Sequence, residues 1–202
     1  MDQIILASQS PRRRDILTGM GVNFIVVPSA YEEHLDDTRP AEEVTIELAL
    51  GKASEVAQRY PDSYVIGSDT IVTIDGKQLA KPENAEQARA MLKSLAGKVN
   101  YVTTSVVVIK QAKGVKLVGA DTAKVFFKPF DEQAVAAYIA TGDPLDKAGG
   151  YGIQSGGAVL IDHIEGEYDT IVGLPSKLLA ELLAQIGIEA KPAQLDSPVP
   201  VH

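Results

Sequence analysis

Short continuous apolar runs alternate along the chain with segments in which apolar residues recur every three to four positions. The continuous runs predict strands at residues 4–7, 24–27, 64–74, 101–109, 115–127 and 158–161, of which the first and the last are expected to be buried. The helical spacing predicts helices at residues 11–18, 40–58, 85–95, 131–142 and 176–187. Pro11 suits a first helical position, and Asp131 and Ser176 are expected to cap the last two helices. This order, with one hairpin around Gly114, predicts an α/β fold in which helices flank a mixed, twisted sheet.

The pattern supports one domain over residues 1–190, whose sheet is either continuous or split into two lobes around a cleft. The sequence shows neither an internal repeat nor a linker. Residues 29–39 are polar, acidic and aperiodic, which predicts a loop. Residues 191–202 contain three prolines and are predicted to form a loosely ordered tail.

Charge and composition narrow the chemistry. Lys and Arg number 19 against 27 Asp and Glu, and the net charge of −8 argues against general binding to nucleic-acid backbones. The net charge of −8 is still compatible with a small phosphorylated ligand in a local basic pocket. The lack of Cys excludes thiol nucleophiles and thiolate zinc sites, and the three histidines (His34, His163 and His202) are scattered. A bound metal would therefore use oxygen ligands, which favours Mg²⁺ or Mn²⁺.

No segment of the sequence approaches the ~20 apolar residues that span a bilayer. The apolar run at residues 4–7 is too short for a signal peptide and no basic region precedes it. We therefore expect a soluble, cytoplasmic protein without a membrane partner.

Residues 8–14 read SQSPRRR and join the first predicted strand to the first helix. The free N–H groups of a helix N-terminus bind anions, and Arg side chains add forked donors that match phosphate oxygens. Three arginines in a first helical turn also oppose the helix dipole, a conflict that an anionic ligand relieves. The alternative is a Ser cap followed by solvated arginines.

Asp69, in the segment GSDT, interrupts an otherwise apolar strand. Asp is unfavourable in a strand and costly to bury without a partner. A Mg²⁺ ion or a catalytic water would explain it. An Asp that is hydrogen-bonded at a bulge near Gly67 is the equal alternative.

Two lysines and an acidic pair are weaker signals. Lys52 falls on the apolar stripe of its helix, where a packed stem with a solvated ammonium is the favoured interpretation in isolation. Lys81 precedes Pro82, and Glu32-Glu33 lies within the acidic loop.

Residues 146–154 read DKAGGYGIQ, and their glycines permit either close approach to a ligand or simple loop flexibility. Neither a GxxxxGK[ST] nor a GxGxxG pattern is present. All these signals together supply cations for a polyphosphate and carboxylates for a hard cation, which is what phosphoryl chemistry needs.

The segments SQSPRRR, GSDTIV, LAKP and DKAGGYGIQ, in this order and spacing, resemble the Maf family of nucleoside triphosphate pyrophosphatases over about residues 3–187. The resemblance implies an elongated α/β fold with a deep cleft, similar to that of the inosine triphosphatase-like enzymes, in a homodimer. It also implies hydrolysis of a nucleoside triphosphate to the monophosphate and pyrophosphate with a divalent cation, Mg²⁺ or Mn²⁺.

The resemblance further implies roles for single residues. Asp69 matches the family's proton acceptor. The phosphate- and substrate-binding positions of the family correspond to Ser8, Arg13, Glu33, Lys52 and Lys81. Glu33 and Asp69 are the carboxylates expected to hold the metal. The positions that separate substrate subgroups correspond to Arg12, Thr70 and Gln154, which resemble the subgroup acting on dTTP and UTP rather than on 7-methyl-GTP.

The sequence therefore predicts a cytoplasmic dTTP/UTP pyrophosphatase that removes surplus or modified pyrimidine triphosphates. Two alternatives belong to other classes. A nucleotide-responsive regulator of cell division and septum formation is one, since the family has been linked to septum formation. A nucleic-acid-binding module is the other, and the net charge of −8 opposes it.

Overall fold

A single mixed sheet organises the protein, whose computed structural model describes residues 2–33 and 36–202. The strand order is β2-β1-β3-β5-β6-β7, and β4 pairs with β3 beside this path. The strands are β1 (Ile4–Leu6), β2 (Ile25–Val26), β3 (Tyr64–Ile74), β4 (Lys77–Leu79), β5 (Val99–Lys110), β6 (Val115–Phe127) and β7 (Ile161–Glu165). Strand β1 is parallel to β2 and β3, and the other pairs are antiparallel. The predicted mixed α/β sheet with flanking helices is therefore confirmed.

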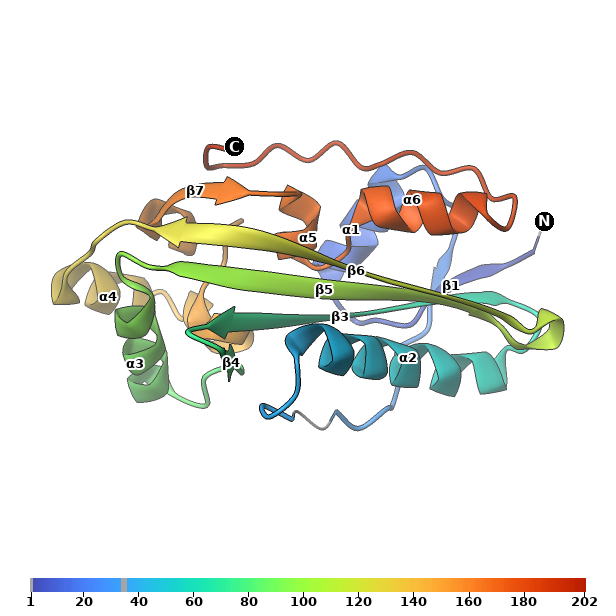
Figure 1. Cartoon of the computed structure of the whole chain (residues 1–202), viewed down its shortest axis with the longest axis horizontal. Coiled ribbons are helices and arrows are strands. Elements are labelled where there is room, and N and C mark those ends of the chain that lie inside the picture. Colours follow the sequence, from blue (N-terminus) through green and yellow to red (C-terminus); the bar gives the residue numbers. More distant parts are fainter. Residues whose placement is uncertain (1, 34–35) are drawn as a thin grey trace.

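Helices cover both faces of the sheet (Figure 1). They are α1 (Pro11–Gly19), α2 (Ala41–Arg59), α3 (Ala85–Leu95), α4 (Glu132–Ile139), α5 (Tyr168–Val172) and α6 (Ser176–Ala184). Helix α2 lies along one face, α1, α5 and α6 lie on the other, and α3 and α4 gather at the end of the sheet near β4 (Figure 1). The short 3₁₀ helices are η1 (Gln111–Lys113), η2 (Asp143–Asp146), η3 (Ala148–Gly150) and η4 (Gly156–Leu160).

Small residues bring α2 close to the sheet. A Cβ atom on Gly67 of β3 would lie 2.4 Å from the carbonyl oxygen of Ala49 and 2.9 Å from the Cβ of Ala53. Only glycine fits there, so α2 packs directly on β3. The β3–β5 register runs without interruption from Val65 to Thr73, which excludes the bulge considered near Gly67.

The structure corrects three details of the predicted elements. The strand expected at residues 158–161 is wrong, because residues up to Leu160 form η4, Val159 is 71% exposed, and the strand begins at Ile161. Ser176 is the first residue of α6 rather than its cap; its amide donates to the side chain of Asp169 at 2.8 Å. Helices α4 and α6 end at Ile139 and Ala184, before the predicted ends near residues 142 and 187.

The C-terminal segment follows the edge of the sheet beside β7. The amide of Ile164 donates to the carbonyl of Pro200, and the amide of His202 donates to the carbonyl of Ile164, both at 2.9 Å. The loose order predicted for residues 191–202 is a statement about their motion, so it stays a prediction. Among the described residues, no helix combines the length and the apolar character needed to cross a membrane.

Candidate active site

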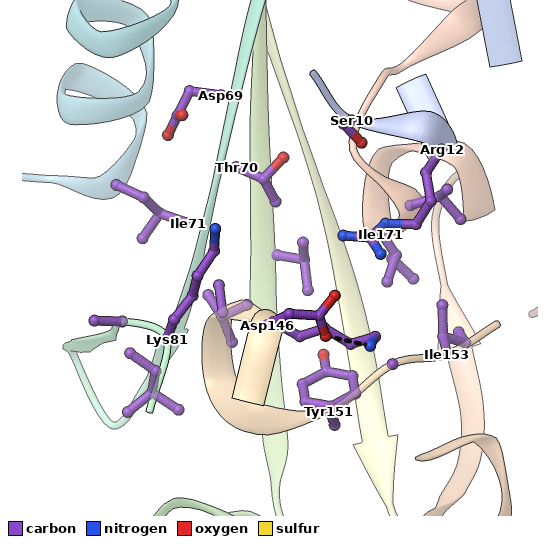
Figure 2. A pocket seen from close by; sticks show the side chains of 18 of the residues that line it. Ser10, Arg12, Asp69, Thr70, Ile71, Lys81, Asp146, Tyr151, Ile153 and Ile171 are labelled. Atoms are coloured by element: carbon purple, nitrogen blue, oxygen red, sulfur yellow. Dashed lines mark hydrogen bonds and ion pairs between the residues drawn. The ribbon is translucent and has the colours of Figure 1, made fainter. Parts of the chain in front are cut away.

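A cavity of about 1030 Å³ opens where strand β3 lacks one neighbour. Pairing with β1 ends at Ile66 and pairing with β4 starts at Val72. Within the described chain, residues 67–71 are therefore paired with β5 alone. Because successive side chains of a strand point to opposite faces, Asp69 and Thr70 point away from each other at this open edge (Figure 2). Both line the same cavity.

Asp69, Lys52 and Glu33 form the charged centre of the cavity. The Lys52 Nζ lies 2.5 Å from the Asp69 Oδ1 and 2.7 Å from the Glu33 Oε1. Asp69 and Lys52 are both buried, whereas the Glu33 side chain is half exposed. The interpretation favoured for Lys52 in isolation, a packed stem with a solvated ammonium, is therefore wrong. The ammonium pairs with two carboxylates instead.

Two close contacts explain why these residues meet. The fit of α2 on Gly67 puts Lys52 next to Asp69, two residues further along β3. A Cβ on Gly51 would lie 2.3 Å from the Tyr31 ring, so this ring rests on the backbone of α2. Tyr31 thereby fixes the loop that carries Glu33. The remainder of the loop predicted at residues 29–39 includes residues 34 and 35, which lie outside the described residues.

The electrostatics of the two carboxylates differ. Burial raises the pKa of Asp69 above its ordinary value, although the charges of Lys52 and Arg13 oppose this. For Glu33, partial burial would raise the pKa, but the hydrogen bond and charge of Lys52, with the charges of Lys81 and Arg13, lower it. The site thus makes Asp69 a stronger base than an ordinary Asp, and it favours the ionised form of Glu33 more than water does.

Arg13 faces the cavity from the first turn of α1, which Ser10 caps by accepting a hydrogen bond from the Arg13 amide. Its guanidinium donates from Nε to the carbonyl of Gly173 at 2.8 Å and from its two terminal nitrogens to Ser8 Oγ and Thr70 Oγ1. Burial lowers the pKa of Arg13, against the charges of Asp69 and Glu33. A guanidinium has five N–H donors, so one donor on each terminal nitrogen remains for a ligand. Two such donors form the fork that suits a phosphate group.

Gly173 and Ser8 hold this fork from behind. Gly173 has a φ of 118°, and a Cβ there would lie 3.3 Å from Thr70 Oγ1 and 3.5 Å from Arg13 Nε. Its carbonyl also accepts from Ser68 Oγ at 3.0 Å. Ser8 is buried beneath the Arg13 side chain rather than on the cavity wall, which places it behind the expected phosphate group.

Arg12 and Lys81 add two cations on opposite sides of the cavity (Figure 2). Arg12 stands next to Arg13, and the charge of Arg12 helps to lower the pKa of Arg13. Lys81 is exposed, its charge acts on Glu33, and within the described residues it makes no ion pair. Lys81 therefore remains available to a ligand.

The other two specificity candidates also line the cavity. Thr70 shares its hydroxyl between Arg13 at 3.2 Å and Thr104 at 3.0 Å. Gln154 is exposed, and its side chain lies beside the hydroxyl of Tyr168. Burial raises the pKa of Tyr168 more than the hydrogen bond with Gln154 lowers it. All nine predicted site residues thus gather at one cavity or directly behind its wall.

The carboxylates also fit a hard divalent cation. The described residues hold no group of three or more acidic or histidine side chains placed for a metal ion. Glu33 and Asp69 nevertheless bring oxygen atoms to one point, which the Lys52 ammonium shares. Mg²⁺ commonly binds through one or two carboxylates together with water and substrate phosphates. The donor set therefore suits a cation that arrives with a polyphosphate.

Several residues of the site escaped the sequence patterns. Ser68, Gly173, Tyr31 and Gly51 shape it through contacts between distant segments. Ser68 stands in the GSDT segment beside Asp69, and Gly173 precedes Leu174-Pro175 at the end of a short apolar run, whereas Tyr31 and Gly51 carry no such signal. Apolar side chains of Ile71, Ile153 and Ile171 add a nonpolar wall (Figure 2).

Cations and carboxylates that converge in one deep cavity of an α/β fold define a protein that handles phosphorylated small molecules. Comparison with known families narrows this class. The chain belongs to the Maf-like protein family, whose model matches residues 3–186.

Curated relatives agree closely with this assignment. A protein of Dictyoglomus thermophilum is 44% identical over 92% of this chain and 96% of its own length, and one of Pyrococcus furiosus is 43% identical over 91% and 95%. A third, from Bacillus cereus, is 42% identical over 94% and 92%. Each of the three is named dTTP/UTP pyrophosphatase.

Among solved structures, a HAM1 protein from Coxiella burnetii matches 63% of this chain and 73% of its own, with 15% identity and a TM-score of 0.40. The expected similarity of the fold to that of the inosine triphosphatase-like enzymes stays a prediction.

Proposed function

We propose that this protein hydrolyses dTTP and UTP to the nucleoside monophosphate and pyrophosphate. The observation that carries the proposal is the buried Asp69–Lys52 pair beside the forked donors of Arg13. The names of relatives at 42–44% identity support the same substrates.

The cations of the site would bind the triphosphate. A triphosphate carries about four negative charges near neutral pH, and the chain itself has a net charge of −8. Binding therefore needs a local cluster of positive charge. Arg13 offers two free donors, Lys81 is unpaired among the described residues, and Arg12 adds a third charge.

Asp69 would act as general base. It accepts a proton from the water whose oxygen attacks the α-phosphorus, and the bond from that phosphorus to the α–β bridging oxygen breaks. Pyrophosphate then leaves with the electron pair of that bond. Burial raises the pKa of Asp69, which strengthens it as a base, and Lys52 orients the carboxylate through Oδ1.

Glu33 and Asp69 would hold the divalent cation, Mg²⁺ or Mn²⁺. When bound, such a cation neutralises charge on the phosphate oxygens and on the departing pyrophosphate. Glu33 suits this role because Lys52 and the neighbouring cations outweigh its partial burial and lower its pKa, so it stays ionised.

Arg12, Thr70 and Gln154 would set the preference for pyrimidines. The Gln154 amide offers a donor and an acceptor that match the O4/N3–H edge shared by uracil and thymine. Thr70 would act through Arg13, which uses its hydroxyl as an acceptor. A 7-methylguanine is larger and cationic, so the charge of Arg12 disfavours it. Uracil and thymine differ by one methyl group, so both triphosphates should be substrates.

A nucleotide panel tests the proposal. Rates and products are measured for dTTP, UTP, CTP and 7-methyl-GTP with added Mn²⁺ or Mg²⁺, and D69N serves as the matched inactive control. We expect UMP and pyrophosphate from UTP, with kcat/KM for dTTP and UTP above that for 7-methyl-GTP. Preferred hydrolysis of 7-methyl-GTP would refute the subgroup, and release of orthophosphate would refute the reaction.

A regulator of cell division and septum formation that only binds nucleotides is less favoured. A pure binder has no need of a buried carboxylate with a raised pKa beside the phosphate fork. The family resemblance also supports a homodimer. The lack of a long apolar segment supports a cytoplasmic protein, and the net charge of −8 opposes binding to nucleic acid. Light scattering, cell fractionation and a salt-dependent titration with DNA test these three points.

A further inference from the structure

The segment 147–155 contributes to the cavity wall, and one carboxylate holds both of its ends. Tyr151, Ile153 and Gln154 of this segment line the cavity. Asp143, just before it, accepts hydrogen bonds at Oδ2 from Ser155 Oγ at 2.5 Å and at Oδ1 from Lys147 Nζ at 2.8 Å. The first and last residues of the segment therefore meet on the same side chain.

Tyr138 of α4 ties the middle of the segment to the same point. Its hydroxyl donates to Asp143 Oδ2 at 2.5 Å and accepts from the amide of Gly152 at 2.9 Å. A Cβ on Gly152 would lie 2.3 Å from Ser155 Oγ and 2.5 Å from Lys147 Cε. The segment is thus wrapped tightly around Gly152, and a side chain there would force it open.

Lys147 is saturated within this arrangement. Its ammonium has three donors, and they match the Asp143 carbonyl at 2.9 Å, Asp143 Oδ1 at 2.8 Å and Asp146 Oδ1 at 2.6 Å. Although Lys147 lines the cavity, its charge is already neutralised by neighbours. Its place in the site is structural, in contrast to Arg13 and Lys81.

We propose that Asp143 is a positioning residue for base selection, which fixes the segment 147–155 so that Gln154 meets the pyrimidine edge in one orientation. This inference rests on the proposed function. A free amide can rotate to match either uracil or cytosine, so Gln154 discriminates between them only if its surroundings hold it in place. Asp143, Tyr138 and Ser155 fix the segment on both sides of Gln154, and the Tyr168 hydroxyl lies beside the Gln154 side chain itself.

The chemistry itself is carried by other elements. Asp69 comes from β3, Lys52 from α2 and Arg13 from α1, and none of them contacts Asp143 through a hydrogen bond or ion pair among the described residues. Loss of the anchor should therefore reduce selectivity and substrate affinity, while the turnover of bound substrate changes little.

Three variants break the anchor in different ways. Y138F removes two hydrogen bonds, one to Asp143 and one from Gly152. S155A removes one, and D143N turns an acceptor oxygen into a donor that faces another donor. T141V is the matched control. It also removes two hydrogen bonds at the end of α4, to the carbonyl of Tyr138 and from the amide of Asp143, but none at the carboxylate.

The experiment measures kcat and KM for UTP and CTP, dissociation constants for UMP and CMP, and melting temperature. We expect the UTP:CTP ratio of kcat/KM to fall about tenfold in Y138F and D143N, mainly through a higher KM for UTP, with kcat within about twofold. The UMP:CMP binding ratio should fall in parallel, and both ratios should stay within about twofold of wild type in T141V.

Two results would overturn the inference. One is folded Y138F and S155A proteins that keep the wild-type ratios, and the other is a T141V protein that loses selectivity as strongly as Y138F. A wild-type protein that hydrolyses no nucleoside triphosphate would refute the proposed function instead. The UMP:CMP binding ratios would then still decide on Asp143.

Discussion

Replacing Lys52 by Met tests the charged centre of the site most directly. Met keeps the unbranched apolar stem on the α2 stripe and removes the ammonium, which lies 2.5 Å from Asp69 and 2.7 Å from Glu33. The Glu33 side chain is 53% exposed, so its pair contributes at most about 1 kcal/mol. Asp69 is 6% exposed, and an uncompensated buried charge costs about 3–5 kcal/mol. Because Arg13 still faces Asp69, we expect K52M to lose about 3 kcal/mol of unfolding free energy near pH 7.

The loss should depend on pH in a defined direction. Burial already raises the folded-state pKa of Asp69, and removal of Lys52 raises it further. The folded protein then binds this proton more tightly than the unfolded chain, whose Asp pKa is about 3.9. Stability from this group is therefore fully present below that value and is lost as pH rises through the folded pKa. The cost of K52M should shrink toward pH 4 and be largest at neutral pH and above.

Urea unfolding at about pH 5.5 and about pH 8 measures the unfolding free energy that K52M loses. The proteins compared are wild type, K52M, D69N and the double variant. In the D69N background, K52M should lower the unfolding free energy by less than about 1 kcal/mol, because no buried charge is left without a partner. An equal cost at both pH values and in both backgrounds would refute the reasoning. So would a K52M protein that melts earlier yet keeps full activity per folded molecule, since Lys52 would then only pack.

D69N should lower kcat by at least ~10²-fold with an unchanged circular dichroism spectrum, and near-normal turnover would exclude Asp69 as the base. R13K should raise KM for UTP about tenfold, because an ammonium cannot form the two-donor fork; an unchanged KM would place the phosphates elsewhere. G173A should lower the unfolding free energy by about 1–2 kcal/mol and also raise KM, since a φ of 118° and a contact of 3.3 Å to Thr70 Oγ1, which accepts from Arg13, both oppose a Cβ; wild-type stability would contradict this. In a pH–rate profile, kcat/KM should fall as the pH drops through the Asp69 pKa, which lies above 3.8, and an acid limb at or below 3.8 would contradict the raised pKa. EDTA should abolish hydrolysis and Mn²⁺ or Mg²⁺ should restore it; activity that survives EDTA would exclude the cation.

The long strands and the main helices could be predicted because their signals are local and repeated. Strand β3 was predicted with both ends correct, and Asp69 stood out within it as a polar interruption of an apolar run. Helix α2 was predicted to within one residue at each end. A charged residue on a buried face is unfavourable without a partner, so the pattern that predicts the element also indicates the site.

The elements that were missed are short and depend on distant partners. Strand β4 has three residues and exists through its pairing with β3. Helix α5 has five residues, and the turn after it depends on Asp169, which binds the Ser176 amide seven residues later. The strand predicted at residues 158–161 was displaced for a related reason, because β7 is defined by its pairing with β6 and by contact with the C-terminal segment.

The anchor at Asp143 was beyond prediction for a different reason. Asp143, Lys147 and Ser155 are close in sequence, but nothing in the pattern indicates that Tyr138 points toward them from the end of α4. The glycine-rich segment allowed both a ligand-binding and a flexible loop. The hydrogen bonds around Gly152 show a tightly fastened turn.

The alternation of Asp69 and Thr70 at the open edge of β3 has a consequence for how this protein can evolve. The two residues serve opposite faces of the sheet, and the long ladder from Val65–Ile109 to Thr73–Tyr101 fixes which face each one takes. A single-residue deletion in β3 ahead of Asp69 would shift this register and exchange the faces, which would turn the base away from Lys52 and the hydroxyl away from Arg13. Lineages should therefore accumulate insertions in the loops around the cavity while the lengths of the central strands stay constant, even at points remote from the substrate.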